Sequence, residues 1–319
     1  MENKTETKNN TKEENEEKKL LSPKLDVVFQ ALFGEIGSER ITKKFLEAIL
    51  ERKIEEVDLS GNIVLRRENV EDKMGVLDVI AKINNNEYAN IEMQVADKDN
   101  LLERILYYWA RVYTRNIKKG EDYIELKKTI EILIVDFEIK QLKKLGYHSK
   151  WKIIEEKDRK LILTDDLEIH IIEINKIKNL TEKEKNKELV KWIYFLEEPD
   201  GERVKEYMKS DSGIKEAKGK LETMSEDERM QILADLRLKA IMDEKAIKRL
   251  GYKKGLASGI KDGIKQGIKQ GIKQGIEQGI EQGENKKTTE IAKKMKSENI
   301  DIAIIKRITG LTEEEIEKL

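Results

Sequence analysis

Two short apolar runs, each carrying one acidic residue and separated by three asparagines, constrain this chain more than any other feature. Residues 76–83 read VLDVIAKI and residues 88–95 read YANIEMQV, with asparagine at positions 84–86. Both runs are typical of β-strands, and an asparagine-rich turn between two strands predicts a hairpin. If the three asparagines form the loop, Asp78 lies opposite Glu92.

The acidic residues of this hairpin predict a cation site. Side chains alternate between the two faces of a strand, so Glu92 and Gln94 share a face, and the pairing brings Asp78 to it. A carboxylate among aliphatic side chains is costly unless it has a partner or a metal. An ion-paired strand residue is the simpler alternative, but two carboxylates and an amide that converge predict a hard divalent cation.

Composition excludes several classes of protein. The 319 residues are 40% charged with a net charge of −1, so nucleic-acid binding would need a local basic patch. The absence of cysteine excludes disulfides and thiolate zinc sites and fits a cytoplasmic protein. No apolar run approaches the ~20 residues of a membrane span. No phosphate-loop or dinucleotide motif is present, so we expect neither a membrane nor a nucleotide cofactor.

Hydrophobic periodicity predicts the order of elements. Helical spacing covers residues 24–33, 41–51 and 100–118, and strand-like runs cover residues 63–65, 76–83, 88–95, 130–137, 153–154 and 167–174. Strands that alternate with helices in this order predict an α/β fold with a mixed sheet and a right-handed crossover. The two histidines, His148 and His170, match no metal-ligand spacing, and we expect them to be ordinary residues.

The helix expected at residues 100–118 has two distinct faces. Its apolar stripe contains Leu102, Ile105, Trp109 and Val112. A basic stripe on another face contains Arg104, Arg111, Arg115 and Lys118. Because this helix directly follows the Glu92 strand, the basic stripe is a candidate contact for duplex phosphates. A solvated charged face is the alternative.

Beyond residue 180 the pattern is helical, and one part of it is repetitive. Thr181–Glu184, Ser225–Glu228 and Thr312–Glu315 have the form of helix capping boxes. Glycine recurs every fourth residue from Gly251 to Gly283 in units such as Gly-Ile-Lys-Gln. A period of four is helical, but glycine costs ~1 kcal/mol per site relative to alanine. Both a helix packed on partner helices and a flexible linker therefore remain open.

Four motifs in order resemble a known family. Residues 24–29 (KLDVVF) with residues 32–34 (LFG), residues 77–79 (LDV), residues 91–94 (IEMQ) and residues 103–109 (ERILYYW) are similar to motifs of the recombination-promoting nuclease (Rpn) family. That family is a branch of the PD-(D/E)XK nuclease superfamily. The resemblance covers residues 20–137 well, and the glycine repeat and the C-terminal GLTEEEI also look like family tails.

The resemblance implies a restriction-endonuclease-like mixed sheet flanked by helices, followed by an all-α C-terminal tail. It implies a Mg²⁺-dependent DNA endonuclease in which Asp78 and Glu92 hold the cation. Gln94 occupies the position where the superfamily usually has lysine and would orient the attacking water. Asp26 matches an acid of the family's first helix and would complete the metal site, although it could instead cap its helix. The superfamily's proline before the first aspartate is replaced by Leu77.

Composition, periodicity and this resemblance together divide the chain into segments. We expect a disordered tail at residues 1–19, a nuclease-like domain at residues 20–200 and a helical extension at residues 201–250. The glycine repeat at residues 251–283 and a small helical unit at residues 284–319 follow. Roles in recombination, mobile-element biology or defence against foreign DNA would be downstream of DNA cleavage. The competing hypothesis is a catalytically weak or silent nuclease-fold protein that oligomerises through residues 251–319.

Overall fold

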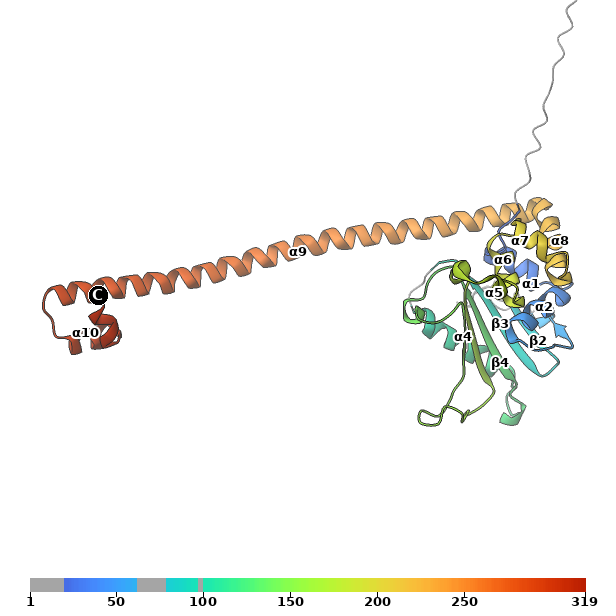
Figure 1. Cartoon of the computed structure of the whole chain (residues 1–319), viewed down its shortest axis with the longest axis horizontal. Helices are drawn as coiled ribbons and strands as arrows, with labels where there is room; N and C mark the ends of the chain where they lie inside the picture. Colours follow the sequence, from blue (N-terminus) through green and yellow to red (C-terminus); the bar gives the residue numbers. More distant parts are fainter. Residues whose placement is uncertain (1–19, 62–78, 97–99) are drawn as a thin grey trace, which may run out of the picture. The chain divides into compact units, whose positions relative to one another are not determined.

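The computed structural model of the chain describes residues 20–61, 79–96 and 100–319. Several sequence predictions lie outside the described residues, namely the N-terminal tail, the strand at residues 63–65 and the site residue Asp78. The described strands form one six-stranded sheet in the order β1-β2-β3-β4-β6-β5 (Figure 1). Their bounds are β1 Val57–Asp58, β2 Val79–Ile83, β3 Glu87–Gln94, β4 Lys128–Val135, β5 His148–Trp151 and β6 Leu167–Glu173.

The sheet is mixed, as the sequence predicted. Strands β3, β4 and β6 are parallel to one another, whereas β1, β2 and β5 run antiparallel to their neighbours. The hairpin between β2 and β3 has the expected register, since Val79 pairs with Ile91 and Ile83 pairs with Glu87. Asn84 and Asn85 in its turn have positive φ angles, a conformation that asparagine adopts more readily than most residues.

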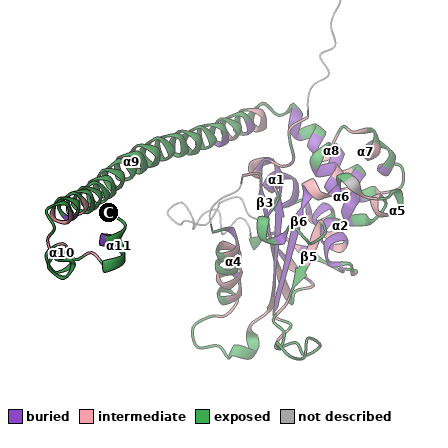
Figure 2. Cartoon of the chain, turned by 60° about the vertical axis from the view of Figure 1, so that its left-hand side comes forward, coloured by how far each residue is buried: buried purple, intermediate pink, exposed green. Residues whose placement is uncertain are grey.

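Helices cover both faces of the sheet. One face lies under α1 (Asp26–Phe33), α2 (Glu39–Leu50), α6 (Glu188–Glu197) and α8 (Ser212–Glu226), and the other lies under α4 (Leu101–Arg115) (Figures 1 and 2). Among the described residues, the remaining helical segments of the first part of the chain are η1 Tyr123–Glu125, η2 Lys140–Leu142, η3 Ile174–Asn179, α5 Glu182–Lys185 and α7 Glu202–Tyr207.

Each face has its own apolar core. Alternation along β3 sends Ile91 and Met93 into the larger core, which includes stacked aromatic rings of Phe33 and Phe45. Leu133 and Val135 of β4 point to the opposite face and pack with Ile105 of α4. Asn90, Glu92 and Gln94, which alternate with these core residues of β3, therefore face α4.

Several local predictions are corrected by the structure. Helix α4 ends at Arg115, so Lys118 lies beyond it. On its apolar face Tyr108 is buried, whereas Leu102 and Trp109 are only half-buried. The strand expected at residues 153–154 is a single bridge between Ile154 and Ile162, and β5 lies before it. Ser225 does not cap a helix, because its hydroxyl donates to the carbonyl of Leu221. Asp227 accepts the hydrogen bonds that begin the next helix.

The chain divides into two compact units, Met1–Met242 and Asp243–Leu319. Helix α9 (Glu228–Ser297) begins in the first unit and runs through the glycine repeat, which is therefore helical. In the second unit, α9 is followed by α10 (Ile302–Thr309) and α11 (Glu313–Glu317), whose capping box at Thr312 forms as predicted. Ala292, Ile305 and Ile316 form a small separate core. None of the helices in the described residues is long and apolar enough to cross a membrane.

Candidate active site

The α4-facing side of β3 carries a row of buried polar side chains. Asn90, Glu92 and Gln94 follow one another on this side, and they are 2%, 9% and 5% exposed. Strand alternation places them there because Ala89, Ile91 and Met93 fill the core on the opposite side. The row ends with Gln94, whose main-chain carbonyl accepts a hydrogen bond from the amide of Asp136. Glu92 and Gln94 thus share a face, as the sequence predicted.

Arg104, in the first turns of α4, lies over this row. Its guanidinium donates to Oε1 of Glu92 at 3.1 Å and makes a longer contact of 3.5 Å with Oε1 of Gln94. It also donates to the hydroxyl of Tyr108 at 3.2 Å and stacks on the Tyr108 ring, 5.3 Å from its centroid. Arg104 was predicted as one member of a DNA-binding stripe. In the structure it belongs to the same cluster as the acidic site residue.

Gln94 is held in one orientation by its neighbours. Its side-chain amide nitrogen donates to the carbonyl of Ala96 at 3.1 Å, which turns its oxygen toward Arg104. A neutral amide fixed in this way can hold a water molecule but supplies no positive charge. The positive charge next to Gln94 comes from Arg104.

Asp26, the third expected metal ligand, has a different partner. It lies at the first residue of α1 and forms a two-pronged ion pair with Arg237, whose Nε donates to Oδ1 at 2.7 Å and whose Nη2 contacts Oδ2. Its Oδ1 also accepts the amide of Val27. Asp26 thus contacts Arg237 and Val27, and its metal role stays a prediction.

The rest of the basic stripe lies farther along α4 and beyond it. Arg111 is half-buried and packs on the Tyr107 ring, 5.7 Å from its centroid, whereas Arg115 and Lys118 are exposed. Tyr107 itself is 53% exposed. A contact with phosphates stays a prediction for all four basic residues.

Sequence reasoning missed a buried polar pair beside this site. The amide nitrogen of Asn90 donates to Oε1 of Glu131 on β4 at 2.9 Å, and Glu131 is fully buried. Glu131 interrupts an aliphatic run (IEILIV, residues 130–135), which is the same signal that identified Asp78 and Glu92. An acidic residue within an aliphatic run is therefore a signal in the sequence that also selects Glu131.

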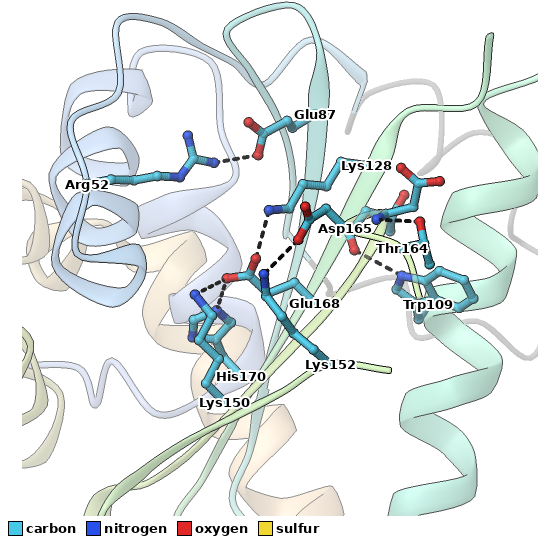
Figure 3. A network of polar contacts seen from close by, with 12 residues as sticks. Arg52, Glu87, Trp109, Lys128, Lys150, Lys152, Thr164, Asp165, Glu168 and His170 are labelled. Atoms are coloured by element: carbon cyan, nitrogen blue, oxygen red, sulfur yellow. Dashed lines mark hydrogen bonds and ion pairs between the residues drawn. The ribbon is translucent and has the colours of Figure 1, made fainter. Parts of the chain in front are cut away.

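A second polar cluster lies on the opposite face of the sheet, along β6. Lys128, Lys150 and His170 converge on the carboxylate of Glu168, at 2.7, 2.5 and 2.8 Å (Figure 3). Nδ1 of His170 lies 2.8 Å from Nε2 of His148, and the two rings stack. The two histidines, expected to be ordinary, are thus neighbours in the fold.

Burial and the charges within this second cluster shift the pKa values of Glu168 and His148. Burial disfavours the Glu168 carboxylate, but hydrogen bonds from His170, Lys128 and Lys150 outweigh burial and hold its pKa well below its usual range. Burial, reinforced by the charges of His170 and Lys150, lowers the pKa of His148 to about 4. No group of three or more His, Cys, Asp or Glu side chains in the described part of the chain is arranged to hold a metal ion.

The mixed six-stranded sheet, its flanking helices and the polar end of β3 define the class: this is a PD-(D/E)XK nuclease fold. A family model described as PD-(D/E)XK nuclease family transposase matches residues 23–250, and the chain belongs to that family. The comparison with curated proteins and the comparison with solved structures found no match. Membership supports nuclease chemistry in general and implies DNA as the substrate.

Proposed function

We propose that the protein is a metal-dependent DNA endonuclease that hydrolyses phosphodiester bonds. The observation that carries this proposal is the placement of Glu92 and Gln94 side by side at the end of β3, in a chain of this nuclease family. Promotion of recombination, and roles in mobile-element or defence biology, would follow from such cleavage.

The donor chemistry of the site fits a hard divalent cation such as Mg²⁺. Glu92 offers carboxylate oxygens, the ligands that Mg²⁺ and Ca²⁺ prefer, and Asp78 and Asp26 are the other proposed ligands. A bound cation supplies Lewis-acid stabilisation of phosphate charge and lowers the pKa of a water molecule. Gln94 would orient the attacking water through its fixed amide.

Arg104 connects the cation site to the substrate. In the structure its guanidinium neutralises Glu92, and a cation at Glu92 would compete with it for the same oxygen. A displaced guanidinium next to the site would bind a phosphate oxygen of the DNA. Arg111, Arg115 and Lys118 extend this positive charge away from the site and would position the duplex.

A plasmid-nicking assay tests the assignment. We expect cleavage with Mg²⁺, none with a chelator, and losses of ~100-fold or more for Asp78→Ala and Glu92→Ala, because metal ligands supply several kcal/mol of transition-state stabilisation. Glu87→Ala is the matched control, because Glu87 is a carboxylate at the other end of β3 that pairs with Arg52. Full activity of the two site variants, with folds verified by circular dichroism, would refute the site.

Self-association through the tail is a second candidate function. One observation favours it: seven aliphatic side chains recur along α9 in the repeat, each more than half exposed (Leu256, Ile260, Ile264, Ile268, Ile272, Ile276 and Ile280). Exposed apolar rows of this kind mark protein interaction surfaces. Light scattering on the full chain and on a chain that ends at residue 250 should give a mass above that of one protomer only for the full chain. If each chain had the mass of its own single protomer, tail-driven assembly would be contradicted.

A further inference from the structure

Helix α4 presents the aromatic ring of Tyr107 to solvent beside the proposed active site. Tyr107 is 53% exposed, whereas Tyr108, the next residue, is buried on the apolar face of the helix. Single exposed aromatic residues are common on protein surfaces and need no function. Tyr107 differs from such residues because its ring is fixed in place and is joined by a series of contacts to Glu92.

The contacts run from the acidic site along the surface of α4. Arg104 donates to Oε1 of Glu92 at 3.1 Å and to the hydroxyl of Tyr108 at 3.2 Å. The Tyr108 ring meets the Tyr107 ring at 61°, with the two centroids 5.6 Å apart. Nη1 of Arg111 donates to the Tyr107 hydroxyl at 3.4 Å, and its guanidinium lies 5.7 Å from the centroid of that ring. Two neighbours therefore hold the exposed ring at a set position relative to Glu92.

The ring and the two arginines lie on one flank of α4. Successive residues turn by about 100°, so Arg104, Tyr107 and Arg111, which are three and four residues apart, are neighbours on the helix surface. The same turn places the exposed acid Glu103 on the other side of Tyr107 from the arginines. A phosphate would therefore bind on the arginine side of the ring. A nucleotide whose phosphate lies at Arg104 has the Tyr107 ring within reach of its base.

A ring in this position suits a base that is not paired. In a duplex each base is stacked on its neighbours, so a protein side chain reaches only the base edges in the grooves. An unpaired base offers its face, and every base has such a face, so stacking on an aromatic ring does not depend on sequence. Loss of one such stacking contact weakens binding by roughly 5- to 150-fold. Arginines beside the ring supply the phosphate contacts that accompany stacking in single-strand binding sites.

We infer that Tyr107 stacks on an unpaired base of the DNA strand whose phosphate lies at Arg104, so that the substrate of this site is DNA with unpaired nucleotides. The inference rests on the endonuclease proposed above and specifies its substrate class. Arg104 holds the phosphate beside the cation site, and Tyr107 holds the base. The paired part of the DNA extends along Arg115 and Lys118. Cleavage then falls beside the unpaired nucleotide.

Binding of two matched duplexes by the full chain tests the inference. The duplexes differ by one bulged nucleotide, so their charges are nearly equal, and the salt concentration is fixed because phosphate contacts depend on it. Fluorescence anisotropy is measured with Ca²⁺, which takes the same oxygen ligands, in place of Mg²⁺ so that the DNA stays intact. We expect the parent to bind the bulged duplex about tenfold more tightly. Tyr107→Ala should weaken the bulged duplex by about tenfold and leave the paired duplex within about twofold.

Two further variants separate stacking from a general effect on α4. Tyr107→Phe keeps the ring and should keep the preference for the bulged duplex. Leu106→Ala is the matched control, because Leu106 is 54% exposed on the same helix but points away from the arginines, and both affinities should stay within about twofold. The fluorescent base 2-aminopurine at the bulge reports stacking directly. Its fluorescence should fall on binding to the parent and to Tyr107→Phe, and not on binding to Tyr107→Ala. Circular dichroism checks that helix content is equal.

The outcomes distinguish this inference from the endonuclease itself. Equal affinity of the parent for the two duplexes, or equal weakening of both by Tyr107→Ala, overturns the unpaired-base contact. With Mg²⁺, the parent should cut the bulged duplex beside the unpaired nucleotide. Cleavage that ignores the bulge refutes the substrate class and leaves the endonuclease standing. Binding of the bulge through Tyr107, with neither duplex cut, supports the base contact and refutes the endonuclease.

Discussion

At the scale of single residues, Arg104 is the group on which the state of the candidate site depends. It contacts Glu92, Gln94 and Tyr108 at once, so one side chain links the acidic ligand, the water-orienting amide and the surface of α4. Glu92 has only 11% of its side chain exposed, and a carboxylate at that depth needs a positive partner. In the structure the partner is Arg104, and a bound cation would take the same role.

Replacing Arg104 by methionine should make the fold more dependent on the cation. We expect Arg104→Met to lower stability by about 1–2 kcal/mol, because Glu92 loses its positive partner at partial burial. Mg²⁺ should then raise the melting temperature more in the variant than in the parent, since no guanidinium competes for Glu92. Differential scanning fluorimetry with and without Mg²⁺ measures both effects. Glu92→Gln serves as the control that should lose the Mg²⁺ response, and equal Mg²⁺ shifts in parent and Arg104→Met would contradict the competition.

The second polar cluster predicts an acid-sensitive fold. The pKa of His148 is lowered by burial to about 4 in the folded chain. Between its ordinary value near 6.5 and about 4 the unfolded chain binds a proton that the folded chain does not, so stability is lost as the pH falls through this window. The contribution of Glu168, whose pKa is depressed, is present above its unfolded value and is lost at still lower pH.

Urea unfolding from pH 7.5 to pH 4.5 should therefore show a steady loss of stability in the parent. His148→Gln removes the titrating ring, and its stability should vary less with pH across the same range. Glu155→Gln, a change at an exposed acid, is a suitable control that should keep the parental slope. Identical pH slopes for the parent and His148→Gln would show that His148 titrates normally in the folded protein.

At the scale of elements, several features that depend on residues close together in the sequence could be predicted. The β2–β3 hairpin, its register and the capping boxes at Thr181 and Thr312 follow from side chains a few residues apart, and all three formed as expected. The sharing of one face by Glu92 and Gln94 follows from strand alternation alone. Long-range pairs were not predictable, because nothing local to Asp26 indicates Arg237, 211 residues away. His148 and His170 likewise meet only because β5 pairs with β6.

In the glycine repeat, the low helix propensity of glycine disfavours the helix that the structure shows. Gly251, Gly255 and Gly259 have open space where a Cβ would lie, so alanine fits at each without a clash in the described chain. Each substitution should stabilise α9 by ~0.5–1 kcal/mol. Thermal melting of the full chain, followed by circular dichroism, should show the repeat melting at higher temperature in the triple alanine variant. An unchanged melting curve would mean that the repeat is not helical in solution on its own.

At the scale of the whole molecule, the chain combines two units with separate cores. The sheet and its helices belong to the first unit, and the start of α9 belongs with them, because Ala234 and Ile241 are buried in the larger core and Arg237 pairs with Asp26. The family match ends at residue 250, close to the division at Met242. The second unit has its own small core of Ala292, Ile305 and Ile316. Cleavage chemistry and self-association are thus proposed for different units.

This division predicts where the chain can be shortened. A chain that ends at Met242 keeps Ala234, Arg237 and Ile241, so its melting temperature should stay within about 2 °C of the nuclease-unit transition in the full protein. A chain that ends at Asp227 loses those contacts and should melt several degrees lower, because burial of such side chains contributes about 1–3 kcal/mol each. Calorimetry on the three chains makes the comparison, and plasmid nicking by the Met242 chain should persist because every proposed site residue is retained. Equal melting of the two shortened chains would show that the start of α9 does not stabilise the first unit.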